Sequence, residues 1–173
     1  MQIHSSSAVA GETSGQFNAR FAFWAMTSLF FIWGFITALN DILLPYLKGA
    51  FSLSYLQAAL VQFCFFGAYF IVSPLAGRLL EKVGYRNGIL TGLLTIAVGC
   101  CLFYPAAELG LYSFFLLALF VLASGITVLQ VSANPYVAVL GDEQHAASRL
   151  SLAQAVNSVG HTAGPLCGAV LIL

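Results

Sequence analysis

One carboxylate lies within an otherwise apolar stretch of the chain. Asp41 follows Thr37 and Asn40, and the apolar residues 42–47 separate it from Lys48. If Lys48 marks the membrane boundary, helical rise places Asp41 about 10 Å inside it, where an Asp costs about 2.5 to 3.5 kcal/mol. Burial would favour the protonated carboxyl, so we expect Asp41 to hold and release a proton. Alternatively, the helix ends near Asn40 and Asp41 lies at the wet interface.

Polar side chains also form two stripes at helical spacing in later apolar stretches. The first comprises Thr127, Gln130 and Asn134, and the second comprises Gln154, Asn157, Ser158 and His161. Amides and hydroxyls supply the donors and acceptors that a neutral polyol such as a sugar requires. The same residue types also join membrane helices through bonds worth about 0.6 to 2 kcal/mol, and for a single residue both uses stay open. Two such stripes flanking a buried acid favour a solute pathway.

The elements that must position these side chains are membrane helices. Of the 173 residues, 60% are hydrophobic and 7% charged, against about 25% charged in soluble domains. Five uncharged stretches, 21–40, 49–77, 87–107, 109–141 and 150–173, each reach the about 20 residues that span a bilayer. They predict an all-α membrane protein with helices at about 21–47, 53–77, 87–107, 110–139 and 149–173. Residues 1–19 are polar, and we expect a disordered cytoplasmic tail there.

Other classes of function are disfavoured by composition and motifs. Six basic residues balance six acidic ones, so no positive surplus exists for nucleic acid. The four cysteines lie in apolar runs without paired C-x-x-C spacing, which predicts small buried side chains and no metal site. Neither H-E-x-x-H nor G-x-S-x-G occurs, which argues against an intramembrane enzyme. We therefore expect no enzyme activity and no cofactor.

Orientation and an internal repeat add to this pattern. A cytoplasmic N-terminus places five of the six basic residues on the cytoplasmic side and leaves Lys48 alone outside. Two short strings recur at nearly the same offset: Pro45-Tyr46 matches Pro135-Tyr136, and Pro74-Leu75-Ala76-Gly77 matches Pro165-Leu166-Cys167-Gly168. Because the period is three helices, the copies would face opposite ways, as in the inverted repeats of secondary transporters.

The loop after the second predicted helix carries a family pattern. It reads Gly77-Arg78-Leu79-Leu80-Glu81-Lys82-Val83-Gly84-Tyr85-Arg86 and resembles the major facilitator signature G-x-L-x-D-R-x-G-R-R. Glu81, Lys82 and Tyr85 depart from that signature, the first two with charge retained. The glycines permit a tight cytoplasmic turn, and charge-assisted bonds there can open and re-form as the protein rocks. The residues expected to form this conformational switch are Gly77, Arg78, Glu81, Lys82, Gly84 and Arg86. The alternative is a solvated charged turn.

A more specific resemblance covers residues from about 20 to 173. Its strings are Leu39-Asn40-Asp41-Ile42-Leu43-Leu44-Pro45, Ala133-Asn134-Pro135-Tyr136, and Arg149-Leu150-Ser151-Leu152-Ala153-Gln154 with Asn157-Ser158. They are similar to the fucose/galactose/glucose:proton symporter family. That resemblance implies a two-lobed, twelve-helix carrier of the bacterial inner membrane, of which this chain supplies five helices of the N-terminal lobe. We therefore expect a truncated piece that lacks its C-terminal lobe.

The resemblance also implies roles for single residues. Asp41 matches the proton-coupling carboxylate, and the expected substrate-binding side chains are Asn40, Gln130, Asn134, Gln154 and Asn157. The fucose branch has glutamate where this chain has Gln130, which favours an aldohexose or amino sugar over fucose and leaves Asp41 as the coupling group. Sodium coupling stays open. Competing hypotheses are a non-sugar carrier of the superfamily, a channel, and a membrane scaffold.

Overall fold

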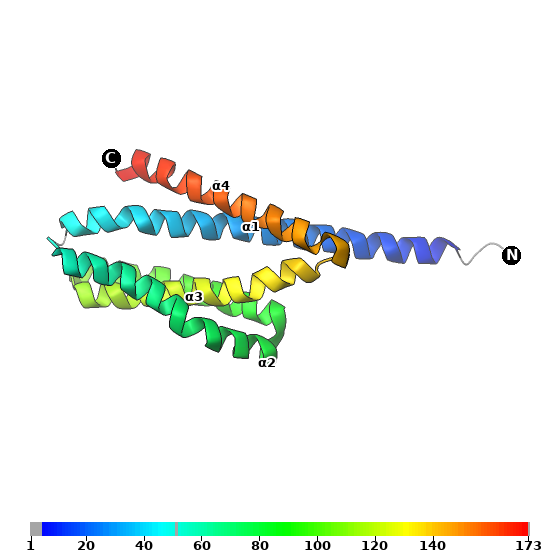
Figure 1. The fold of residues 1–173 in the computed structure, drawn as a ribbon, viewed down its shortest axis with the longest axis horizontal. Coiled ribbons are helices and arrows are strands. Elements are labelled where there is room, and N and C mark those ends of the chain that lie inside the picture. The colour runs from blue at the N-terminus through cyan, green and yellow to red at the C-terminus, as the bar shows by residue number, and fades with distance from the viewer. Residues whose placement is uncertain (1–4, 51, 173) are drawn as a thin grey trace. The chain divides into compact units, whose positions relative to one another are not determined.

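The computed structural model describes the backbone of residues 5–50 and 52–172, and the side chains of 20–42, 48–49 and 52–170. Over this part of the chain the secondary structure is helical and contains no strand. The elements are α1 (Ser5–Ala50), α2 (Tyr55–Leu109), α3 (Tyr112–Val139), a short 3-10 helix η1 (Glu143–His145), and α4 (Ala146–Ile172) (Figure 1). The predicted all-α fold is confirmed.

The long helix α2 consists of two helices that meet at Gly84. This residue has φ 76° and ψ 169°, a positive φ that glycine adopts without steric cost. The sequence predicts a turn at 77–86, but the helix continues through Gly77 because residues 78–83 contain neither glycine nor proline. An unbroken helix of 55 residues would be about 80 Å long, more than twice the hydrocarbon thickness of about 30 Å. The break at Gly84 therefore divides α2 into two membrane-length halves.

The first helix differs from the prediction at its N-terminal end. α1 begins at Ser5, so the backbone of residues 5–19 is helical where we expected a disordered tail. A helix that already exists extends at little cost, because nucleation is the unfavourable step, and no proline interrupts this segment. Residues 1–4 lie outside the described part of the chain.

Three of the described helices have the length and hydropathy of membrane spans. The first is the segment Arg20–Ile42 of α1, and the other two are the whole of α2 and the whole of α3. Of the three, α3 is the most buried. With α2 divided at Gly84 and α4 added, the part of the chain that the structure describes contains five long helices, the number that the uncharged stretches predict. α4 is not among the candidate spans, because its polar stripe lowers its hydropathy.

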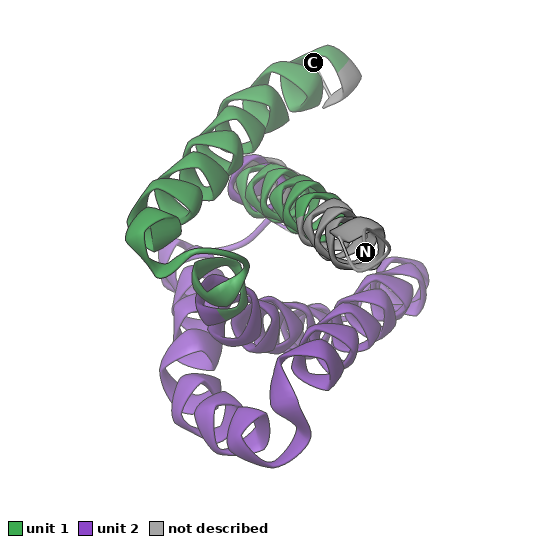
Figure 2. Ribbon diagram, turned by 90° about the vertical axis from the view of Figure 1, so that its right-hand side faces the viewer, with its two compact units in different colours: residues 1–38, 136–173 green, residues 39–135 purple. Residues whose placement is uncertain are grey.

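The described residues fall into two compact units (Figure 2). One unit is Leu39–Pro135, in which α3 packs against both halves of α2. In the first half, the Tyr112 hydroxyl donates to the Gln57 carbonyl oxygen at 2.6 Å. In the second half, a Cβ added to Gly92 would lie 2.7 Å from the Leu129 backbone nitrogen. Small residues allow this close approach of membrane helices.

The other unit contains the residues up to Ala38 and those from Tyr136 onward (Figure 2). Within it α4 packs on α1, where a Cβ added to Gly34 would collide with the Asn157 carbonyl oxygen. The turn from α3 to α4 is fixed by Arg149, whose guanidinium donates to the carbonyl oxygens of Val137, Ala138 and Asp142 at 3.3, 2.7 and 2.8 Å. The bonds to Val137 and Ala138 satisfy carbonyls that the C-terminal end of α3 leaves without helical partners.

Candidate functional site

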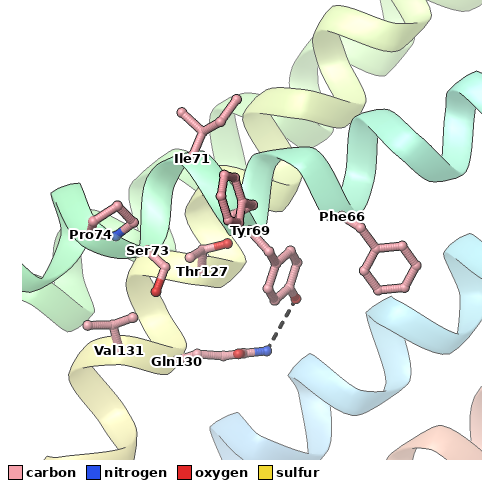
Figure 3. Close-up of a pocket in the computed structure, with 9 residues that line it drawn as sticks. Phe66, Tyr69, Ile71, Ser73, Pro74, Thr127, Gln130 and Val131 are labelled. Atoms are coloured by element: carbon pink, nitrogen blue, oxygen red, sulfur yellow. Dashed lines mark hydrogen bonds between the residues drawn. The ribbon is translucent and has the colours of Figure 1, made fainter.

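A pocket of about 730 Å³ opens between the first half of α2 and α3, within the unit Leu39–Pro135 (Figure 3). Its wall combines aromatic, apolar and polar side chains, among them Phe66, Tyr69, Ser73 and Pro74 of α2 and Thr127 and Gln130 of α3. The volume lies in the range of small-molecule sites, which are mostly apolar with a few placed polar groups. Phe66 is 57% exposed, so its ring is available to a ligand.

Gln130 and Tyr69 meet inside this pocket. The Gln130 Nε2 donates to the Tyr69 hydroxyl at 3.2 Å, and Figure 3 shows the two side chains pointing toward each other. The Tyr69 ring packs against Phe65 with the ring centroids 5.4 Å apart, and Phe65 is fully buried. The packed ring thus fixes the hydroxyl that binds Gln130. Tyr69 was not predicted from the sequence, because an aromatic residue in an apolar helix usually serves packing. Its spacing of four residues from Ser73, which places two hydroxyls on one helix face, is the signal that could have indicated it.

The other residues of the first stripe are placed differently from Gln130. Thr127 lines the same pocket, but its hydroxyl donates to the Ala123 carbonyl oxygen of its own helix at 2.8 Å. Asn134 is half-buried on the next turn. Among the residues of the first stripe, Gln130 is therefore the one whose side-chain amide lines the pocket.

The second stripe contains one buried amide. Asn157 is 7% exposed, and its Nδ2 donates to the Phe30 carbonyl oxygen of α1 at 2.8 Å. Ser158 is exposed and its hydroxyl donates to the Gln154 carbonyl oxygen at 3.1 Å. Gln154 is half-buried and His161 is exposed. The sequence leaves open whether such amides bind a ligand or join helices. The bond of Asn157 to Phe30 joins α4 to α1. Trp33 is 9% exposed and packs against Phe30.

The candidate proton carrier lies on the surface of the described chain. Asn40 is buried at 8% exposure, whereas Asp41 is exposed. Successive residues of a helix point about 100° apart, so the two side chains cannot share one environment. The residues that the structure describes therefore do not bury Asp41 as predicted. The side chains of 43–47, which bear on how α1 continues, lie outside the described residues.

The charged side chains of the predicted switch loop are all exposed: Arg78, Glu81, Lys82 and Arg86. Gly77 is helical with open space around a Cβ, and Gly84 alone takes the positive φ. No ion pair joins Glu81 to a neighbouring basic residue in the described part of the chain. Three cysteines that we expected to be buried, Cys100, Cys101 and Cys167, are exposed on this chain.

The comparison with known proteins specifies the family to which this helical chain belongs. The model of the Major Facilitator Superfamily matches residues 26–173. The chain belongs to this superfamily. Its members are transporters, which confirms the expectation that the chain is not an enzyme.

Two curated relatives are sugar carriers. The chain is 60% identical over 162 residues to a glucose/galactose transporter of Brucella abortus, covering 94% of this chain and 39% of that protein. It is 46% identical over 151 residues to the L-fucose-proton symporter of Escherichia coli, covering 87% of this chain and 34% of that protein. The chain thus spans little more than a third of the length of these relatives. The resemblance found in the sequence motifs is confirmed.

A solved structure matches in the same region. The crystal structure of the E. coli fucose:proton symporter superposes with a TM-score of 0.78 at 43% identity. The match covers 90% of this chain and 37% of that chain. The arrangement of helices is therefore that of one part of a major facilitator carrier.

Proposed function

We propose that a full-length carrier containing this chain takes up a hexose-type sugar together with protons by alternating access. The observation that carries this proposal is the pocket beside α3, in which a hydrogen-bonded amide and hydroxyl, Gln130 and Tyr69, lie near exposed aromatic rings. Sugar hydroxyls need such donors and acceptors, and aromatic rings supply apolar area for the sugar ring. The names of the relatives support the same substrate class.

The proposed substrate is glucose or galactose, with fucose and amino sugars as alternatives. Gln130 is an uncharged amide and cannot carry a proton, so coupling falls on Asp41. Asn40, Asn134, Gln154 and Asn157 complete the proposed substrate-binding set. Asn157 already uses its Nδ2 in the bond to Phe30, which leaves its side-chain oxygen for a ligand.

Asp41 is exposed on the described chain, so shelter from water has to come from elements beyond it. We propose that a C-terminal lobe supplies the opposite wall of the cavity, and that the N-terminus is cytoplasmic. On this view the 173 residues alone, placed in liposomes, accumulate no sugar, because half of the cavity is missing. Accumulation by this chain alone would contradict the two-lobed arrangement.

The central experiment measures uptake of labelled glucose, galactose and fucose by the full-length carrier as external pH is varied. Uphill accumulation should require an inward proton gradient, and Asp41→Asn should abolish it, because an amide cannot exchange protons. A variant that still accumulates sugar uphill with unchanged pH dependence would reject the role of Asp41. Replacing sodium with potassium distinguishes proton from sodium coupling. Counterflow exchange, which a carrier shows and a pore lacks, tests the channel alternative.

A further inference from the structure

The contact with Tyr69 uses only the nitrogen end of the Gln130 amide. Nε2 of Gln130 donates to the tyrosine hydroxyl at 3.2 Å. This leaves the side-chain carbonyl oxygen as the acceptor that the amide can offer to a ligand. Both residues line the pocket, and Figure 3 shows the hydrogen bond between them as a dashed line. The end of the amide that binds the tyrosine therefore decides whether the pocket wall offers a ligand an acceptor or a donor at this point.

A glutamine side chain does not hold such an orientation unaided. Its terminal torsion is broad and nearly two-fold, so nitrogen and oxygen can exchange places. Ordering a free glutamine also costs side-chain entropy when a ligand binds. A partner that binds one end of the amide beforehand reduces both losses, which is the general benefit of a preorganised site.

Tyr69 is suited to be that partner because its ring is fixed by packing. It contacts the rings of Phe65 and Phe66, with centroid distances of 5.4 and 6.5 Å. Phe65 is 2% exposed and anchors the cluster in the core of the unit. A hydroxyl on a packed ring has little freedom of position, whereas the neighbouring serine hydroxyl, Ser73, lies on an exposed short side chain.

We propose that Tyr69 is a positioning residue of the sugar site, which holds the Gln130 amide with its oxygen available to a sugar hydroxyl. This rests on the proposed sugar transport. Tyr69 thereby favours ligands that donate a hydrogen bond at this point of the wall. Removing its hydroxyl should weaken sugar binding through Gln130, and should leave the rate of the conformational cycle unchanged.

The test is a double-mutant cycle in the full-length carrier with labelled D-glucose and D-galactose as probes. Tyr69→Phe keeps the ring and removes the oxygen, and Gln130→Leu removes the amide. Tyr69→Phe should raise KM about three- to tenfold, the effect of one neutral hydrogen bond, with an unchanged maximal rate per carrier. In the Gln130→Leu background the same change should have no further effect, because the group that Tyr69 positions is absent.

Tyr104→Phe is the matched control. It also removes a hydroxyl from α2, where Tyr104 donates to Glu108 at 3.0 Å near the exposed end of the helix. KM should be unchanged in this variant. Gln130→Asn provides a second way to break the pair if Gln130→Leu is poorly expressed, because the shorter side chain cannot reach the tyrosine.

The outcomes separate this inference from the proposed function. A wild-type carrier that transports sugar, combined with equal effects of Tyr69→Phe in both backgrounds, overturns the positioning role alone. An unchanged KM in Tyr69→Phe does the same. A wild-type carrier that takes up neither sugar overturns the proposed function, and the positioning of a sugar falls with it.

Discussion

Two amide side chains of this chain make different contacts although their sequence contexts are alike. Gln130 on α3 is half-buried, lines a pocket and donates to the side chain of Tyr69. Asn157 on α4 is buried and donates to the backbone of α1 at Phe30. Each lies in a polar stripe at helical spacing, and a proline follows in the same helix, five residues after Gln130 and eight after Asn157. The residue type therefore does not decide whether an amide lines a pocket or joins two helices.

The residue opposite each amide explains the difference. Asn157 faces Gly34, where the absence of a side chain lets the two helix backbones approach until the short amide reaches a carbonyl. Gln130 faces Tyr69, whose ring occupies space between α2 and α3 and leaves a cavity beside it. Loss of Asn157 should therefore reduce stability first, and loss of Gln130 should reduce sugar binding first.

The largest expected effect comes from Gly34→Ala. The new Cβ would collide with the Asn157 backbone carbonyl, which cannot move without shifting α4. Overpacking of this kind costs about 1 to 3 kcal/mol or more, and we expect the upper end because the contact is with backbone. Thermal unfolding of the purified carrier in detergent should show a fall of several degrees. Gly67→Ala is the control, since a Cβ there meets nothing within 4 Å; equal losses in both variants would contradict the close α1–α4 contact.

A smaller loss of stability is expected for Asn157→Leu. Leucine has nearly the same shape but cannot donate to the Phe30 carbonyl, so the helix pair loses a bond worth about 0.6 to 2 kcal/mol. The melting temperature should fall in sugar-free buffer, which shows that the loss does not depend on a ligand. Gln130→Leu, measured in the same way, should be close to wild type. Stability equal to wild type for Asn157→Leu would remove the distinction between the two amides.

Gln130→Glu sharpens the ligand side of the comparison. A protonated carboxyl can donate to Tyr69 as the amide does, whereas a carboxylate only accepts, so that the bond reverses and the tyrosine hydroxyl donates. If the site needs a donor at position 130, the sugar KM of the variant should rise as pH increases, by about three- to tenfold across its titration. Uptake kinetics at several pH values, with the proton gradient collapsed in exchange mode, measure this. A variant whose KM follows the wild-type pH profile would show that the donor at this position does not matter.

Much of the fold could be predicted from where charges are absent. The uncharged runs fixed the number of helices, because each run is as long as a bilayer is thick. They could not fix where the second helix ends, since Gly77 and Gly84 both permit a turn and only Gly84 adopts positive φ. They also missed the helical backbone from Ser5, because a polar composition does not prevent a neighbouring helix from extending.

The site was only partly predictable for a different reason. Gln130 could be predicted because an amide is unusual within an apolar run. Its partner Tyr69 lies 61 residues away, and an aromatic residue in an apolar helix gives no sign of a polar role. Only the packing of α3 on α2 brings them together. The burial of Asp41 likewise depends on what lies against α1, so neither the spacing nor the composition of its own helix could establish it.

The smallest expected effect tests whether any polar group of the second stripe matters as such. The Ser158 hydroxyl is exposed and bonds within its own helix to the Gln154 carbonyl oxygen, as Thr162 does to Ser158. Such local bonds contribute little, and substitutions at exposed sites usually change stability by less than about 0.5 kcal/mol. Ser158→Ala should thus leave both the melting temperature and the sugar KM at wild-type values. A raised KM would place a ligand on this exposed face of α4, in addition to the contacts proposed for Gln154 and Asn157.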